Sequence, residues 1–258
     1  MVLPTADSPL GLLLLFLAGC VASGLNAFAG GGSLVSFPML VGLGVAEQAA
    51  NATNAVALWP GSLSSSLGFK KYWNDVKADI LRFATPTFLG SMAGAVLLIV
   101  TPDTVFRAVV PALILAATLL LAFQKQLKKR RGGGERVVKL PAAMILQFAI
   151  SVYGGYFGAG MGILMLALLG LIASGDIHRH NAIKNTLGLF INFTASVIFI
   201  SKGLVLPIPG AALMAGAIVG GYAAAHMSQK VAADALRKGI VIYGFVMTAW
   251  FAWRAFGG

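Results

Sequence analysis

Long apolar stretches cover most of the chain and are separated by short polar turns. Many of them come close to the ~20 residues that a helix needs to cross a bilayer. They run over 10–29, 46–67, 82–100, 104–124, 140–157, 182–201, 206–225 and 239–256. Two shorter apolar pieces, 34–43 and 163–173, each follow a glycine-rich segment. The pattern predicts an all-α, polytopic membrane protein.

The two glycine-rich segments are Gly30-Gly31-Gly32-Ser33 and Gly158-Ala159-Gly160-Met161-Gly162. An unbroken helix over residues 10–43 would be about 51 Å long at 1.5 Å per residue. The hydrocarbon core of a bilayer is only about 30 Å thick. The helix is therefore expected to break at the glycines, leaving one long and one short helical piece in each case.

The order of features repeats along the chain. The segment 28–34 aligns with 157–163, and 49–53 aligns with 182–186. The sequence thus predicts two repeats, 1–124 and 140–258, joined by a basic linker at 125–139. Interrupted helices at corresponding places in two repeats are typical of transporter binding sites. The alternative to a repeat is that the two segments are similar only because any two glycine-rich membrane helices look alike.

Charged residues make up only 10% of the chain, and the net charge is +11. An average soluble domain has about 25% charged residues, so a soluble enzyme and a disordered chain are excluded. Most of the Lys and Arg residues form four clusters, within 70–82, 125–139, 179–184 and 230–238. If each glycine-broken segment is a hairpin that returns to its starting side, all four clusters lie on one face of the membrane.

The rule that cytoplasmic loops are positively charged favours this hairpin arrangement. It makes the two repeats inverted, each with one broken hairpin and three crossings. It places the linker in the cytoplasm and both termini outside, in a multi-pass protein of the plasma membrane. The basic loops are then expected to contact anionic lipid, and no nucleic-acid partner is predicted.

None of the eight acids lies in the interior of an apolar stretch, since Glu47 is at the very start of 46–67. Cation transporters commonly place a carboxylate within the membrane, so a cation path is disfavoured, and so is catalysis by paired carboxylates. The single Cys20 offers no thiolate metal site. No enzyme activity, metal or cofactor is predicted.

The polar side chains within the predicted membrane region are small and neutral, apart from Lys184. A helix that begins at a glycine break presents free N–H groups and the positive end of its dipole, which together favour an anion. The predicted substrate-binding residues are Asn26, Gly31, Gly32, Ser33, Asn51, Thr53, Asn54, Gly160, Gly162, Lys184, Asn185, Thr186 and Asn192. The alternative is that the glycines are packing notches and the Asn and Thr groups are contacts between helices.

The block 28–38, followed by 49–54, resembles the sulfite exporter TauE/SafE family. The block 154–162, followed by 182–186, resembles that family's second copy of the same pattern, although Ala167 stands opposite Pro38 of the first copy. The resemblance implies a transporter of sulfur-containing anions.

We therefore expect a secondary transporter that exports sulfite or an organosulfonate by alternating access. An anion channel or passive facilitator is the alternative. The expected partners are the anion and membrane lipid. The oligomeric state is left open, with a homodimer as one alternative.

Overall fold

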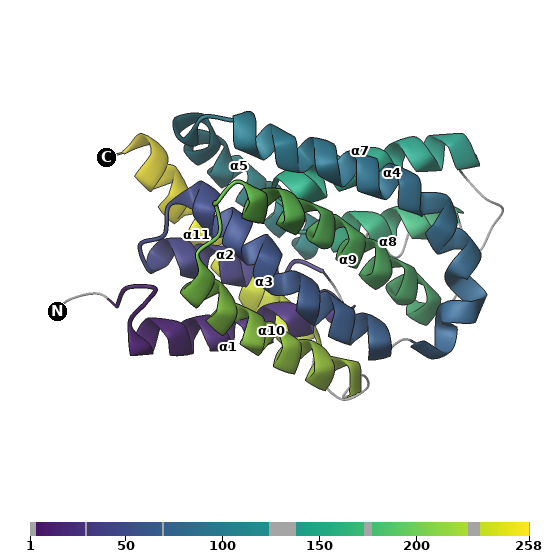
Figure 1. Cartoon of the computed structure of the whole chain (residues 1–258), viewed down its shortest axis with the longest axis horizontal. Helices are drawn as coiled ribbons and strands as arrows, with labels where there is room; N and C mark the ends of the chain where they lie inside the picture. Colours follow the sequence, from purple (N-terminus) through teal and green to yellow (C-terminus); the bar gives the residue numbers. More distant parts are fainter. Residues whose placement is uncertain are drawn as a thin grey trace.

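The computed structural model describes residues 4–28, 30–68, 70–123, 138–172, 177–226 and 233–257. Every regular element in this part of the chain is helical (Figure 1). The predicted basic linker at 125–139 lies outside the described residues except for Val138 and Lys139.

The helices follow the predicted apolar stretches closely. The ten α-helices of the described residues are α1 (Pro9–Phe28), α2 (Ser33–Gly42), α3 (Glu47–Gly68), α4 (Trp73–Val100), α5 (Asp103–Ala122), α7 (Leu140–Tyr156), α8 (Met161–Ile172), α9 (Ile177–Ser201), α10 (Pro207–His226) and α11 (Ala233–Phe256). A short 3-10 turn, Lys70–Tyr72, joins α3 to α4. The start of α4 was predicted nine residues too late, at 82, because its first turns are polar and extend beyond the apolar stretch.

Six of the described helices, α1, α4, α5, α9, α10 and α11, are long and apolar enough to cross a membrane. Helix α3 has 22 residues but is much more polar, since it carries Asn51, Asn54 and a run of serines. Several of its polar side chains are buried inside the bundle. A polar helix can be kept at membrane depth where protein, and not lipid, surrounds it.

Each glycine-broken segment turns back on itself. The N–H of Ala6, before α1, donates to the carbonyl of Leu43, after α2, at 3.1 Å. Helices α7 and α8 likewise pack against each other (Figure 1). The hairpin arrangement favoured by the charge pattern is therefore present in both segments.

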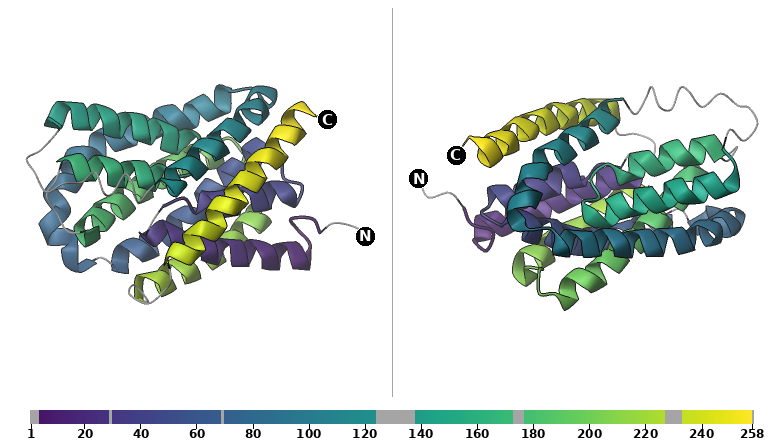
Figure 2. Two further views of the ribbon diagram at one scale, coloured as in Figure 1. Left: turned by 180° about the vertical axis from the view of Figure 1, so that it is seen from behind. Right: turned by 90° about the horizontal axis from the view of Figure 1, so that it is seen from above.

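The molecule has two distinct ends. We call the end that holds both chain termini, the α2–α3 turn and the α4–α5 turn the terminal end (Figures 1 and 2). We call the other end the basic end, because it holds Lys70–Tyr72 and the start of α9, where Arg179 pairs with Asp75 at 2.9 Å. Helix α1 begins at the terminal end and α7 begins at the basic end (Figure 2).

Two pairs of helices make very close contact through glycine. A Cβ atom built on Gly216 of α10 would lie 1.9 Å from the carbonyl oxygen of Phe16 in α1, and one on Gly94 of α4 would lie 2.0 Å from that of Val152 in α7. Small residues let membrane helices approach in this way. Each pair joins a helix from before the linker to one from after it, so the two halves of the chain interlock.

A buried carboxylate ties three helices together at the terminal end. Glu47, at the start of α3, is only 4% exposed. Its Oε2 lies 3.5 Å from Nε of Arg107 in α5, and its Oε1 lies 3.3 Å from Nε of Arg254 in α11. The Arg254 guanidinium also lies over the Trp250 ring, 5.5 Å from its centroid.

Replacing Glu47 with Gln is expected to destabilise the fold by up to about 3 kcal/mol, because two arginines lose a buried partner. Arg179→Gln is the matched control. It breaks an ion pair whose two side chains are each 48% exposed, which costs about 0–1 kcal/mol. Thermal unfolding in detergent measures both variants, and equal melting temperatures would contradict the structural role of Glu47.

Candidate functional site

The two glycine breaks meet in the interior of the bundle. A Cβ atom built on Gly30 would lie 3.0 Å from Cα of Gly162 and from the backbone nitrogen of Ile163. One built on Gly162 would lie 3.2 Å from Cα of Gly30. Gly30 and Gly158 also have positive φ angles, +80° and +78°. Glycine adopts a left-handed backbone without strain and, having no side chain, lets a second backbone come into direct contact.

A side chain from the preceding helix holds each glycine loop. Asn26, in the last turns of α1, accepts the N–H of Gly32 through Oδ1 at 2.8 Å. The hydroxyl of Tyr153, in α7, donates to the carbonyl of Ala159. The loops are therefore fixed by local hydrogen bonds as well as by their contact with each other.

Three side chains reach from one half of the chain to the other and cap the helices that end at the loops. One of them, the Asn185 amide of α9, donates to the carbonyl of Ala27 at 3.4 Å. The Lys184 ammonium, from α9, donates to the carbonyls of Asn26 and Ala27 at 2.7 and 3.2 Å. The Asn51 amide, from α3, donates to the carbonyl of Tyr156 at 2.8 Å. Carbonyls in the last turn of a helix have no partner within the helix, so these side chains supply one.

A cavity lies beside the loops. Its volume is about 30 Å³. Its lining combines glycines of both breaks with polar side chains and two methionines, namely Asn26, Gly30, Gly31, Ser33, Ser62, Gly158, Met161, Gly162, Met165, Lys184, Asn185, Gly188 and Asn192. The positions of Ser62, Met165 and Lys184 along their helices place the cavity on the side of the loops toward the basic end.

Part of the predicted site lines this cavity. The predicted residues that do so are Asn26, Gly31, Ser33, Gly162, Lys184, Asn185 and Asn192. Lys184 is 3% exposed, Asn185 5% and Asn192 7%. They come from α1, α2, α8 and α9, so both halves of the chain contribute to one cavity.

The other predicted residues lie outside the cavity and make contacts between or within helices. Gly32 is close against Ala22, Gly160 faces Ala117, and the Asn51 amide caps α7. The remaining contacts are a bond from Ser36 Oγ to Asn54 Oδ1 at 2.5 Å, one from the Leu206 N–H to Thr53 Oγ1 at 3.0 Å and one from Thr186 Oγ1 to the Ala182 carbonyl at 2.9 Å. In this structure these six residues make packing or helix contacts, and the prediction that they bind substrate stays a prediction.

The sequence prediction did not include the cavity residues Gly30, Ser62, Gly158, Met161, Met165 and Gly188. Gly30 and Gly158 belong to the two breaks, whose positive φ angles could have been anticipated. Ser62 is one of several serines in α3, and the methionines are apolar. Met161 lies in the second break, and no pattern in the sequence distinguishes Ser62 and Met165 from ordinary helix residues.

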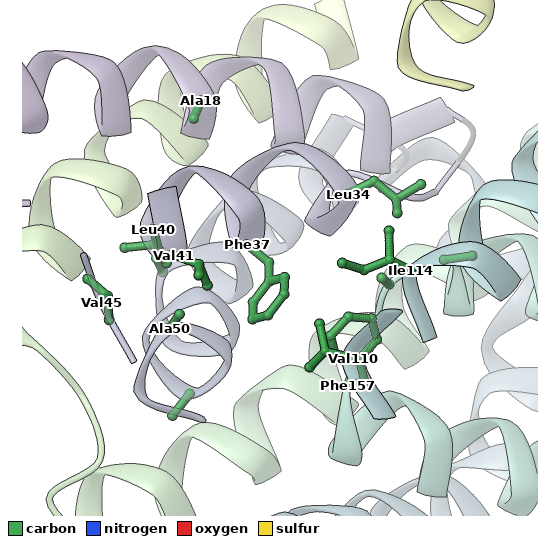
Figure 3. Packing of buried hydrophobic residues seen from close by; sticks show 14 of the residues in the cluster. Ala18, Leu34, Phe37, Leu40, Val41, Val45, Ala50, Val110, Ile114 and Phe157 are labelled. Atoms are coloured by element: carbon green, nitrogen blue, oxygen red, sulfur yellow. The ribbon is translucent and has the colours of Figure 1, made fainter. Parts of the chain in front are cut away.

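An aromatic cluster packs on the terminal-end side of the loops. The Phe37 ring of α2 stacks on Phe251 of α11 at 5.5 Å and meets Phe157 edge-on at 5.2 Å. Figure 3 shows Phe37 and Phe157 together with Val110 and Ile114 of α5. None of these residues lines the cavity.

A polar cavity at two helix breaks inside an apolar helical bundle is typical of membrane transporters. Residues 15–251 match the family model described as Sulfite exporter TauE/SafE. The chain belongs to the sulfite exporter TauE/SafE family, a family of membrane transporters and not of enzymes. It is therefore a multi-pass membrane transport protein.

Curated relatives agree with this assignment over nearly their whole length. A "Probable membrane transporter protein" of Haemophilus influenzae is 30% identical over 240 residues, which is 92% of this chain and 93% of the relative. The "Probable membrane transporter protein YfcA" of Escherichia coli strain K12 is 27% identical over 242 residues, covering 94% and 90%. No solved structure matches the chain.

Gly30→Ala is expected to lower the yield and melting temperature of the folded protein strongly, because the new methyl would meet the backbone of Gly162. Gly44→Ala is the matched control, since Gly44 has a φ of +91° but nothing within 4 Å of an added Cβ. That variant bears only the backbone strain, about 1–2 kcal/mol. Similar melting temperatures for the two variants would show that the contact between the loops is not needed.

Proposed function

We propose that the protein is a secondary transporter that exports a small sulfur-containing oxyanion, either sulfite or an organosulfonate, across the plasma membrane. The observation that carries this proposal is the cavity, where buried Lys184 and the amides of Asn185 and Asn192 gather beside two helix starts. Hydrogen-bond donors and helix N-termini suit an anion. None of the lining residues is an acid.

We also propose that the segments 1–124 and 140–258 are inverted repeats. The opposite starting ends of α1 and α7 support this (Figure 2). Further support comes from the two crossing caps, because aligning the repeats sets Ala27 opposite Tyr156 and Asn51 opposite Lys184. Lys184 caps the helix that ends near Ala27, and Asn51 caps the helix that ends at Tyr156.

Alternating access is the mechanism that this arrangement favours. The cavity lies on the basic-end side of the loops, and the aromatic cluster around Phe37 packs on their terminal-end side. In the opposite state, Phe37 and Phe157 would separate while the basic end closed over the cavity. Because the positive-inside rule puts the basic end in the cytoplasm, the cavity lies on the cytoplasmic side of the loops in this conformation.

A passive anion pathway is the second candidate. It is favoured by the absence of an acid among the cavity-lining residues, since a proton-coupled carrier usually has a carboxylate at depth. Efflux of radiolabelled sulfite from proteoliposomes, with and without an imposed proton gradient, separates the two. Accumulation against a gradient would identify a coupled carrier, and flux that only dissipates a gradient would identify a facilitator. Proteoliposomes that release sulfite no faster than protein-free vesicles would contradict both.

Asn185→Leu is expected to reduce sulfite efflux about 10- to 100-fold, because a hydrogen bond to a charged group is worth about 1.5–3 kcal/mol. Ser196→Ala is the matched control on the same helix. The Ser196 hydroxyl is buried but donates to the Asn192 carbonyl within α9. Normal efflux by a well-folded Asn185→Leu variant would remove Asn185 from the site.

A further inference from the structure

We propose that Met161 limits the size of the anion that the cavity admits. The site then takes a compact oxyanion, such as sulfite or methanesulfonate, and excludes sulfonates with longer alkyl groups. This inference rests on the proposed function and names the residue that would decide between sulfite and the bulkier organosulfonates.

The first observation is the volume of the cavity. A site for one water needs about 10–15 Å³, so a cavity of about 30 Å³ holds about two or three waters. This is the scale of a small oxyanion. A sulfonate with an alkyl chain needs additional space, which has to come from movement of the lining residues.

The second observation is the composition of the lining. Met161 and Met165 are the two apolar side chains among the described lining residues, and the others are glycines or polar residues. An alkyl group placed against buried polar side chains would leave their hydrogen-bonding groups without partners, which is costly. A bound sulfonate would therefore keep its head at the polar side chains and turn its alkyl group toward the methionines.

Of the two methionines, Met161 has the more adaptable position. Met165 is 1% exposed and belongs to a buried cluster that includes Leu168 and Leu169. Met161 is partly buried and stands at the start of α8, directly after the glycine loop. A methionine side chain has three rotatable bonds and fills irregular gaps. The conformation of Met161 therefore controls how much space beside the loop is left for a ligand.

Three glycines adjoin the space that the Met161 side chain occupies. A Cβ atom built on Gly154 of α7 would lie 2.8 Å from Sδ of Met161, and one on Gly158 would lie 4.0 Å from the same sulfur. One built on Gly188 of α9 would lie 3.8 Å from Cε of Met161. Gly158 and Gly188 also line the cavity, so shortening the Met161 side chain would add its space to the cavity.

A broken hairpin does not require a side chain at this position. The alignment of 28–34 with 157–163 sets Gly32 opposite Met161. A Cβ atom built on Gly32 would lie 2.0 Å from the carbonyl oxygen of Ala22, so the first hairpin has no room for a side chain there. In the second hairpin, Gly154 leaves that room. Packing of the hairpin does not explain the methionine, whereas its place beside the cavity does.

The test compares alkanesulfonates of increasing length on the purified full-length protein. Methanesulfonate, ethanesulfonate and propanesulfonate carry the same head group and the same single charge, so the comparison varies only the size of the alkyl group. Sulfite is measured beside them. Affinities are measured by calorimetry or by ligand-induced thermal stabilisation, each variant being compared with itself without ligand.

The wild-type protein is expected to bind methanesulfonate at least about tenfold more tightly than propanesulfonate, because a pocket discriminates one methylene by about 10- to 200-fold. Met161→Ala is expected to strengthen propanesulfonate binding and bring the ratio of the two affinities close to one. A loss of stability alone would weaken the binding of both sulfonates alike and would not change this ratio.

Met39→Ala is the matched control. Met39 is a partly buried methionine of α2, the short helix of the first hairpin, and it does not line the cavity. The same substitution at this position is expected to leave the ratio of the two affinities at its wild-type value.

Gly188→Ala is the opposite change and keeps the proposal testable if Met161→Ala fails to fold. The added methyl would meet the end of the Met161 side chain at 3.8 Å, which is an ordinary van der Waals contact, and alanine favours a helix more than glycine does. The variant is therefore expected to fold. It narrows the cavity and should raise the ratio of methanesulfonate to propanesulfonate affinity several-fold above the wild-type value.

The outcomes separate this inference from the proposed function. If neither sulfite nor any alkanesulfonate binds, the proposed function itself is wrong. If propanesulfonate binds the wild-type protein as tightly as methanesulfonate, or if a folded Met161→Ala or Gly188→Ala variant keeps the wild-type ratio, the proposed function stands but the size limit at Met161 is wrong.

Discussion

The contact between Gly30 and Gly162 is the constraint on which the rest of the structure depends. The two backbones can come this close only because neither position carries a side chain. Their approach brings the ends of α1 and α7 and the starts of α2 and α8 to one place. Four helix termini in the interior leave many backbone N–H and C=O groups without partners inside their helices. Many of the surrounding polar side chains form hydrogen bonds with these groups.

This need explains why the buried polar residues divide into two groups. One group, with Asn26, Tyr153 and Asn51, satisfies the loops and the helix ends. The other group lines the cavity beside them. Asn26, Lys184 and Asn185 belong to both groups, because each bonds a loop or a helix end and also lines the cavity. Irregular backbone is tolerated at membrane depth where it is enclosed by protein or lines a cavity, and both conditions hold here.

Much of the fold could be predicted from the sequence because its causes are local. The length of the apolar stretches fixes the helices, and the glycines fix the breaks. The hairpin turns followed from the distribution of Lys and Arg, which is a property of the whole chain. The burial of Glu47 could not be predicted, because it depends on the ends of α3, α5 and α11 meeting at one place.

The site was only partly predictable for the same reason. The residue types around the breaks indicated an anion site, but the spacing of Asn51, Thr53 and Asn54 along α3 does not say which helix each one faces. Their partners come from α2, α7 and the turn before α10. Ser62 was missed because its contribution depends on how α3 packs against α9, which is a matter of tertiary packing.

The central claim is that an oxyanion binds in the cavity beside the two glycine loops. The most direct measurement is anomalous diffraction from crystals grown with selenite, the heavier analogue of sulfite. The account predicts a selenium peak in the cavity, with its oxygens within hydrogen-bond distance of Lys184 Nζ and the Asn185 amide. Ordered selenite found only outside this cavity, with the cavity empty, would contradict it.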